Sequence, residues 1–341
     1  MRIFIYILII VSSCKNLYCY SLFDTSFYDV EFVSNNIEDR KITKIREIKT
    51  KSLIRIFKKT ISDEKLNEIQ KLLSEDLINT FVKNIVIDDE IIIDNKYVSK
   101  IKVNFEKKNI IKFYRDKKIP YVEYHPNKFL LILYEENIIN DNLFSKNNNY
   151  YSYLINNLQN SSKLKIPNHD INDRYILKKE HIKNRDINKI KLFSKKYNLD
   201  EIIIVIAKNN NNNVFYDLIL ISDNNIIEKR LKYKENQLDK FFNVLEIETL
   251  SMWKKANFIQ NKNLNFLNCN INYFNNLELK EIRKKMNNIS IIQNLDIKSL
   301  SYKKIEYNIQ FFGNFKILKN LLNLNKLKIN DPNFNCVIKL K

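Results

Sequence analysis

The chain has 341 residues, of which 45% are hydrophobic and 12% aromatic, so it is long enough for two or three domains with real cores and is not disordered or collagen-like. A single glycine excludes glycine-rich phosphate loops and nucleophile elbows. The 58 Lys and Arg against 39 Asp and Glu give a net charge of +19, but Lys is spread along the chain, as an AT-rich genome would encode it, so we expect no specific nucleic-acid interface.

Residues 1–21 resemble an export signal. Arg2 supplies a positive start, and Ile3–Val11 is an unbroken apolar run that is too short for a membrane-spanning helix. Cleavage after Ser21 would release a soluble protein, which is the outcome we favour. Alternatively, the sequence ending at Cys14 is similar to a bacterial lipobox, in which Cys14 would be lipidated and would tether the protein to a membrane.

Residues 22–125 are predicted to form an N-terminal α+β module. Hydrophobic spacing predicts a helix over residues 39–59, and Ser62 or Asp63 is a suitable N-cap for a second helix that carries Leu66 to Leu77. The other elements expected are strands over Phe27–Val33, Lys83–Ile92 and Lys96–Phe105, and a helix over Asn109–Asp116. Pro120 and Pro126 bracket a linker-like stretch.

Residues 126–260 are predicted to form a small three-layer α/β module. Phe129–Tyr134 and Ile202–Ala207 are apolar without alternation, which is typical of parallel strands covered on both faces. The remaining elements expected are helices near Tyr150–Leu158, Ile187–Tyr197 and Leu238–Trp253, strands over Val214–Ser222 and Ile226–Tyr233, and a polar loop over Asn168–Arg174.

Residues 261–341 have the order strand, helix, strand, strand, helix, strand, which predicts a ferredoxin-like split βαβ sandwich. The first and last strands are neighbours in that topology, and Cys269 and Cys336 are expected to face inward from them. We therefore hypothesise a Cys269–Cys336 disulfide, with two buried free thiols as the alternative.

No pattern of catalytic, cofactor-binding or metal-binding residues emerges. His125, His169 and His181 are the only histidines, and nothing places them at ligand spacing with nearby carboxylates. The adjacent acids of Asp88–Glu90 and Glu135-Glu136 would point to opposite faces of a strand, so we interpret them as solvated. No enzymatic activity and no cofactor are predicted.

Six segments follow one another in a recognisable order: KIREIKTKSLIRIFKKTI, YVSKIKVNFE, IPYVEYHPNKFLLIL, FSKKYNLDEIIIV, MWKKANFI and IQFFGNFKILKNLL. Taken in this order, they resemble an uncharacterised family of exported proteobacterial proteins, known only as domain of unknown function number two thousand and sixty-six. The landmarks that match the family are Pro120, Tyr121, Pro167, Asp170, Asp173, Trp253 and Gly313. At the level of fold, the arrangement is also similar to accessory lipoproteins of flagellar, curli-secretion and penicillin-binding-protein-activator type, whose small α/β modules bind proteins.

The signal segment, the missing catalytic pattern and the modular layout lead us to expect an exported, non-enzymatic accessory protein of the bacterial periplasm or a periplasm-facing membrane surface. It would act through contacts with an unknown envelope protein in envelope assembly or maintenance. Two alternatives remain open. One is a periplasmic hydrolase with a site near Asp170 and Asp173 in the middle module, which predicts a deep pocket there. The other is a basic protein that binds anionic surfaces, which predicts a continuous basic face and steep salt dependence.

Overall fold

The computed structural model describes residues 21–136, 143, 150, 153–155, 163–210, 212–223, 225–234, 237–260, 264–330 and 336–341. Cys14 and almost all of the predicted signal segment lie outside these residues, as does most of the helix predicted over Tyr150–Leu158. In the described part of the chain, no helix combines the length and apolar character needed to cross a membrane.

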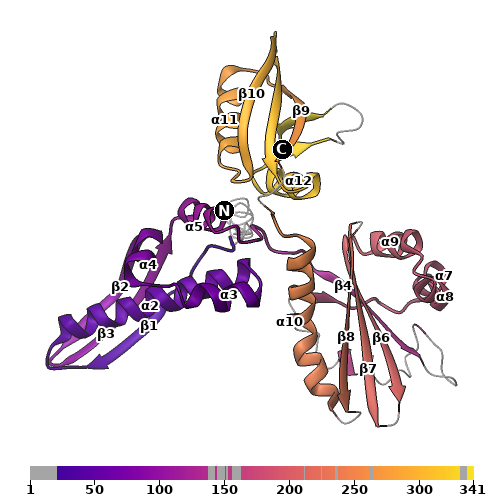
Figure 1. Cartoon of the computed structure of the whole chain (residues 1–341), viewed down its shortest axis with the longest axis horizontal. Helices are drawn as coiled ribbons and strands as arrows, with labels where there is room; N and C mark the ends of the chain where they lie inside the picture. Colours follow the sequence, from indigo (N-terminus) through magenta and orange to yellow (C-terminus); the bar gives the residue numbers. More distant parts are fainter. Residues whose placement is uncertain are drawn as a thin grey trace, which may run out of the picture. The chain divides into compact units, whose positions relative to one another are not determined.

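The described residues form a mixed α+β structure with three sheets, as the sequence predicts (Figure 1). Contacts divide the chain into two compact units. The first comprises Met1–Lys59 and Leu72–Ile110, and the second comprises Thr60–Lys71 and Ile111–Lys341.

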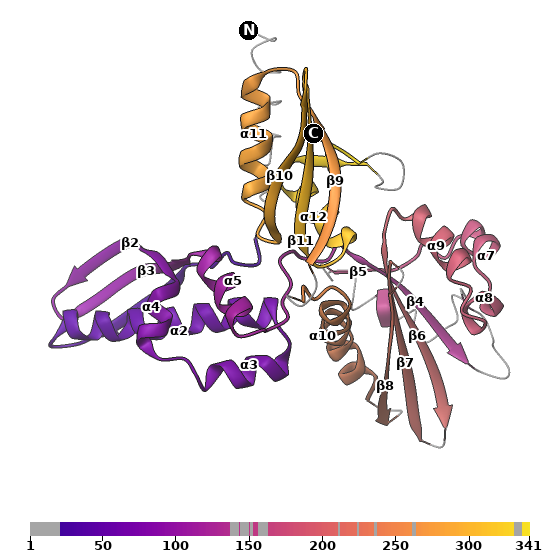
Figure 2. The ribbon, with the colours of Figure 1, turned by 45° about the horizontal axis from the view of Figure 1, so that its top comes forward.

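The first unit is built on an antiparallel sheet in the order β1-β3-β2. Its strands are β1 (Tyr28–Val33), β2 (Val82–Ile93) and β3 (Lys96–Phe105), and its helices are α2 (Ile37–Thr60) and α4 (Glu75–Phe81). Alternate residues of β3 are buried, including Tyr97 and Ile101, and α2 runs along the sheet and buries Leu53 and Phe57 (Figures 1 and 2). The buried residues that alternate along β3 and those that recur every three or four positions along α2 therefore pack into one hydrophobic core.

We predicted one helix from Ser62 to Leu77, and this prediction is wrong, because the structure has two helices there. Ser62 caps α3 (Asp63–Gln70) by accepting a hydrogen bond from the amide of Lys65. A second serine, Ser74, caps α4 in the same way through the amide of Leu77. A second N-cap inside the periodic run therefore starts a new helix. The helix expected before Pro120 is present as α5 (Lys107–Asp116).

The middle sheet has the order β5-β4-β6-β7-β8. Its strands are β4 (Phe129–Glu136), β5 (Leu164–Lys165), β6 (Glu201–Asn210), β7 (Asn213–Ser222) and β8 (Asn225–Lys234). Strand β4 is parallel to β5 and β6, and β6, β7 and β8 form an antiparallel meander. The two apolar runs are thus parallel strands, as predicted, and the structure shows that they are neighbours.

Helices cover both faces of this sheet, which gives the three layers expected (Figure 1). Helix α10 (Leu238–Ala256) packs on β7 and β8 and stacks Phe241 on Tyr216, with ring centroids 3.6 Å apart. On the other face lie α7 (Ile171–Ile176), α8 (Lys179–Lys183) and α9 (Ile187–Lys196). The polar loop predicted over Asn168–Arg174 is wrong in its second half, because Asp170 caps α7 there.

The C-terminal sheet has the order β10-β11-β9-β13-β12. Its elements are β9 (Leu264–Asn272), α11 (Asn276–Asn287), β10 (Ile292–Ser301), β11 (Lys304–Phe312), α12 (Phe315–Leu324), β12 (Leu327–Ile329) and β13 (Val337–Leu340). This is the predicted split βαβ order with one strand added. Strand β13 turns back on β12 and pairs in parallel with β9, so that β12 lies at the edge.

The stretch between Pro120 and Pro126 is not the linker that the sequence suggested. Tyr121 and Val122 are fully buried. Tyr121 forms a β-bridge with Ile259, and the amide of Val122 donates to the carbonyl of Thr60 at 2.8 Å. The aromatic and β-branched side chains between the two prolines make this segment part of the core of the second unit.

Candidate functional site

Asp173, the acid proposed for a hydrolase site, is fully buried. Its carboxylate accepts hydrogen bonds from Lys196 Nζ and from the hydroxyl of Tyr197, each at 2.7 Å. The other acid, Asp170, accepts from the same Lys196 Nζ at 2.7 Å and caps α7 through the amide of Asp173. Both acids therefore fasten α7 to the end of α9, and neither lines the groove described below.

The charge state of this cluster matches that structural role. Hydrogen bonds from Lys196 lower the pKa of Asp170. Burial acts to lower the pKa of Lys196, but its hydrogen bonds to Asp170 and Asp173 outweigh this effect and raise that pKa. Burial lowers the pKa of His169, which is half-buried beside them, to about 4. Across the residues that the structure places, no group of three or more His, Cys, Asp and Glu side chains has the arrangement of a metal site.

The other residues that match the resembled family, among them Pro120, Pro167, Trp253 and Gly313, also have structural roles. Pro167 is buried and Pro120 is half-buried. Trp253 is buried on α10 and packs edge-on against Tyr124, with ring centroids 5.3 Å apart. Gly313 has φ 84° at the turn between β11 and α12, a conformation that favours glycine.

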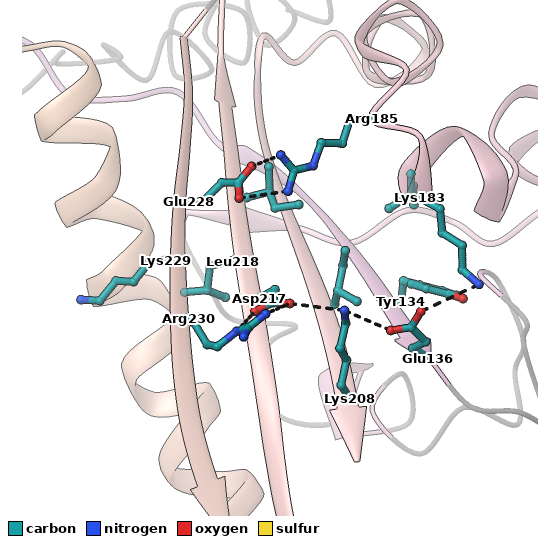
Figure 3. Close-up of a pocket in the computed structure, with 13 residues that line it drawn as sticks. Tyr134, Glu136, Lys183, Arg185, Lys208, Asp217, Leu218, Glu228, Lys229 and Arg230 are labelled. Atoms are coloured by element: carbon teal, nitrogen blue, oxygen red, sulfur yellow. Dashed lines mark hydrogen bonds and ion pairs between the residues drawn. The ribbon is translucent and has the colours of Figure 1, made fainter. Parts of the chain in front are cut away.

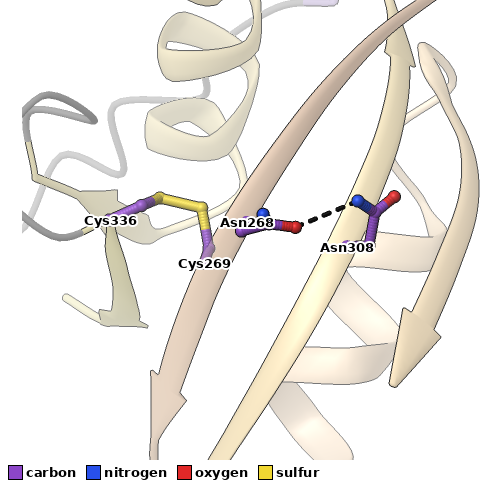
Figure 4. Close-up of a disulfide and its surroundings, with 4 residues drawn as sticks. All are labelled: Asn268, Cys269, Asn308 and Cys336. Atoms are coloured by element: carbon purple, nitrogen blue, oxygen red, sulfur yellow. Dashed lines mark hydrogen bonds between the residues drawn. A yellow bond between two sulfur atoms is a disulfide. The ribbon is translucent and has the colours of Figure 1, made fainter. Parts of the chain in front are cut away.

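Cys269 and Cys336 are joined in a disulfide in the structure, with their Cα atoms 4.5 Å apart (Figure 4). Cys269 lies on β9 and Cys336 directly precedes β13, so the bond links the neighbouring strands that the sequence analysis paired. The carbonyl of Cys336 also accepts a hydrogen bond from the amide of Asn270 at 2.8 Å.

The candidate functional site is the open half of one face of the middle sheet. Helices α7 to α9 cover the apolar half of this face, where Leu130, Ile132, Ile202, Ile204, Ile219 and Ile221 form the core with residues of those helices. Farther along the same strands, the same face becomes charged. The charged residues there are Glu136 on β4, Lys208 on β6, Asp217 on β7, and Glu228 and Arg230 on β8.

Strand register sets these charges side by side. Glu136 is paired with Lys208, Asp217 with Arg230, and Ile219 with Glu228. Because β4 and β6 are parallel, Glu136 and Lys208 stand at their carboxyl ends, the edge where open α/β sheets bind ligands. The residues enclose a groove of about 610 Å³.

Ion pairs cross the floor of the groove from strand to strand (Figure 3). Lys208 Nζ lies 3.2 Å from Glu136 Oε2 and 3.6 Å from Asp217 Oδ2. Arg230 binds Asp217 with two nitrogens, one of them at 3.0 Å. The signs therefore alternate across four strands.

Two side chains from the helical layer border the groove. Arg185, which follows α8, binds Glu228 through two hydrogen bonds of 2.6 and 3.0 Å. Lys183 Nζ lies 3.9 Å from Glu136 and 5.7 Å from the centroid of the Tyr134 ring. The groove is therefore lined by Lys and Arg side chains in excess of its acids.

This arrangement suits recognition of charged groups. Hydrogen bonding to Arg230 lowers the pKa of Asp217, so this carboxylate is ionised. It is bound to Arg230 and is not suited to accept a proton. In two of the ion pairs both side chains are exposed: Lys208 and Glu136 by 43% and 41%, and Arg185 and Glu228 by 57% and 44%. Exposed ion pairs of this kind contribute little to stability, so a ligand can exchange their partners at small cost.

The sequence analysis missed the groove and treated Glu136 as one of two solvated acids. The sequence does contain an indication of the groove. On β4 and β6, every second residue lies on the same face of the sheet, and these residues change from apolar to charged at Glu136 and at Lys208. The alignment of those changes depends on strand order and register, which the sequence does not show.

No family model matches the chain, so the resemblance to the family of unknown function stays a prediction, and no curated protein matches it. Among solved structures, the chain is similar to one described as the LpoB C-terminal domain from Salmonella enterica, with 10% sequence identity and a TM-score of 0.22, over 37% of this chain and 93% of that one.

Proposed function

We propose that this chain is an exported, non-enzymatic accessory protein of the periplasm or of a periplasm-facing membrane surface, which acts by binding another protein during envelope assembly or maintenance. The observation behind the binding role is the charged groove on the middle sheet. The export signal predicted at the N-terminus and the Cys269–Cys336 disulfide support the compartment, because disulfides persist in oxidising compartments.

The groove fits an extended segment of a partner protein. Its charges lie on four neighbouring strands, so they span three interstrand spacings, or about 15 Å. An extended peptide of about five residues covers that distance. Because the signs alternate and cations are in excess, the matching segment carries acidic side chains together with at least one basic side chain. Charge complementarity of this kind mainly sets specificity and the rate of association.

Site-specific photo-cross-linking in the native host tests the proposal. A photoreactive amino acid replaces Lys183 at the border of the groove, and a control replaces Lys328, an exposed lysine on β12 of the C-terminal sheet. We expect one reproducible partner from position 183 that is absent from position 328. Adding Lys208→Glu should weaken that cross-link by roughly tenfold, because it reverses the central charge of the groove.

Two results would contradict the proposal: identical products from the two positions, or a cross-link that Lys208→Glu leaves unchanged. A variant that folds incorrectly would be recognised by loss of the far-ultraviolet circular dichroism spectrum. The measurement does not depend on membrane binding, which is tested separately below.

A further inference from the structure

One end of the C-terminal sheet exposes a group of large apolar side chains. The turn between β10 and β11 presents Tyr302, which is 88% exposed, and β10 ends close to Leu300, which is 71% exposed. The turn between β9 and α11 presents Phe274, and the first turn of α11 presents Leu277, both 76% exposed. We call these four residues, with Lys303, the aromatic tip.

Contacts between the two turns hold the aromatic tip together. The amide of Tyr273 donates to the carbonyl of Lys303 at 3.2 Å, so the turns are neighbours at the same end of the sheet (Figure 2). Lys303 Nζ lies 4.8 Å from the centroid of the Phe274 ring and 5.2 Å from that of Tyr302. One ammonium group therefore contacts both exposed rings, a cation–π arrangement that holds the rings together in water.

The chemistry of the aromatic tip distinguishes it from ordinary surface. Single exposed apolar residues are normal, whereas a group of them marks an interaction site. Tyrosine is enriched at membrane interfaces, where its amphipathic ring sits at the level of the lipid headgroups. Lysine side chains extend from such positions toward the polar layer.

The charge around the aromatic tip favours an anionic surface. Lys304 follows Lys303 in the chain, and Lys280 lies one helical turn after Leu277. Glu278 accepts a hydrogen bond from the amide of Phe274 at 2.6 Å, so one acid lies at the tip, and the three lysines outnumber it. Each basic residue near an anionic leaflet adds about 1 kcal/mol to membrane binding.

We propose that the aromatic tip inserts into the headgroup region of a bilayer that contains anionic lipids, with Phe274 and Tyr302 as the inserted rings. This peripheral attachment is independent of the charged groove and of any lipid on Cys14. It would present the protein to its partner at a membrane surface.

Vesicle binding tests this proposal. The mature chain from Leu22 onward, which lacks Cys14 and the predicted signal segment with its apolar run Ile3–Val11, is sedimented with vesicles of equal parts phosphatidylcholine and phosphatidylglycerol. We expect binding, and we expect the double variant Phe274→Ser/Tyr302→Ser to bind at least roughly tenfold more weakly, since two exposed rings lose their apolar contact. The matched control is Phe266→Ser, which removes another exposed ring, on β9, and should bind as the parent does.

A fluorescence measurement locates the insertion. Trp253 is buried, so a tryptophan introduced by Tyr302→Trp reports on the aromatic tip, and one introduced by Phe266→Trp reports on the sheet. Vesicles should shift the emission of the first variant to the blue and leave the second unchanged. The proposal is overturned if the parent does not bind, if the double variant binds equally well, or if the Tyr302→Trp emission responds to an envelope protein and not to vesicles.

Discussion

Breaking the Cys269–Cys336 bond should destabilise the C-terminal module by up to about 4 kcal/mol. The two cysteines are 67 residues apart in sequence, and closing a loop of that length removes entropy from the unfolded chain worth about 4 kcal/mol at 25 °C. The effect should appear first between β9 and β13, because these strands share only a short parallel pairing beside the bond.

Hydrogen exchange measured by mass spectrometry is suited to this question, since a chain with several modules does not unfold in one step. The protein is compared in its oxidised form, in its reduced form, and as Cys269→Ala/Cys336→Ala. A loss of 4 kcal/mol corresponds to about three orders of magnitude in the opening equilibrium, so amides of β9 should exchange far faster in both bond-free forms. Amides of β6 in the middle sheet are the internal control.

The reduced protein distinguishes the effect of the disulfide bond from the effect of burying the two sulfur atoms. It keeps both sulfur atoms, whereas the alanine variant also loses their buried volume. If exchange at β9 is unchanged on reduction, the entropy argument is refuted. If alkylation with and without reductant gives equal masses, the bond itself is absent.

Three further predictions concern single residues. Asp173→Asn should cost about 2 kcal/mol in chemical unfolding because it removes a buried charged acceptor, whereas the exposed Asp170→Asn should cost less than about 1 kcal/mol; equal costs would contradict this. His169 should titrate near pH 4 by NMR, so the stability that its neutral form contributes is complete above about pH 6.5 and falls as the pH drops toward 4; a pKa near 6.5 would refute its burial. Lys326→Gly should stabilise the chain by about 1 kcal/mol, because Lys326 has φ 59°, and Lys328→Gly on β12 should destabilise it.

Much of the fold could be predicted from side-chain period. The apolar runs of β4 and β6 predict buried parallel strands, and their pairing in parallel confirms it. The split βαβ order predicted that the first and last strands of the C-terminal module are neighbours, and β9 and β13 pair as expected, with Cys336 directly before β13. Local capping was harder to foresee, because Ser74 and Asp170 each start a helix where the hydrophobic pattern shows either a continuous helix or a loop.

The two proposed binding surfaces were beyond the sequence for a different physical reason. Glu136 and Arg230 are far apart in the chain and share a groove only because β6 and β7 lie between their strands. Phe274 and Tyr302 likewise meet only because the β9 and β11 strands are paired. Side-chain period determines which face a residue occupies, whereas strand order determines its neighbours. The sequence indicated strand neighbours only in the C-terminal module, through its split βαβ order.

The scarcity of glycine leaves a physical mark on the turns. Gly313 is the one glycine of the chain, and among the described residues every other position with positive φ is Asp, Asn, Lys, Arg or His. Asp and Asn tolerate this conformation through local hydrogen bonds, but Lys and Arg do so at a cost of roughly 1 kcal/mol each. The cost is spread over separate turns, so glycine substitutions at Lys303 and Lys326, which lie in the same module, should be additive. A double variant no more stable than Lys326→Gly alone would show that the turns are not strained independently.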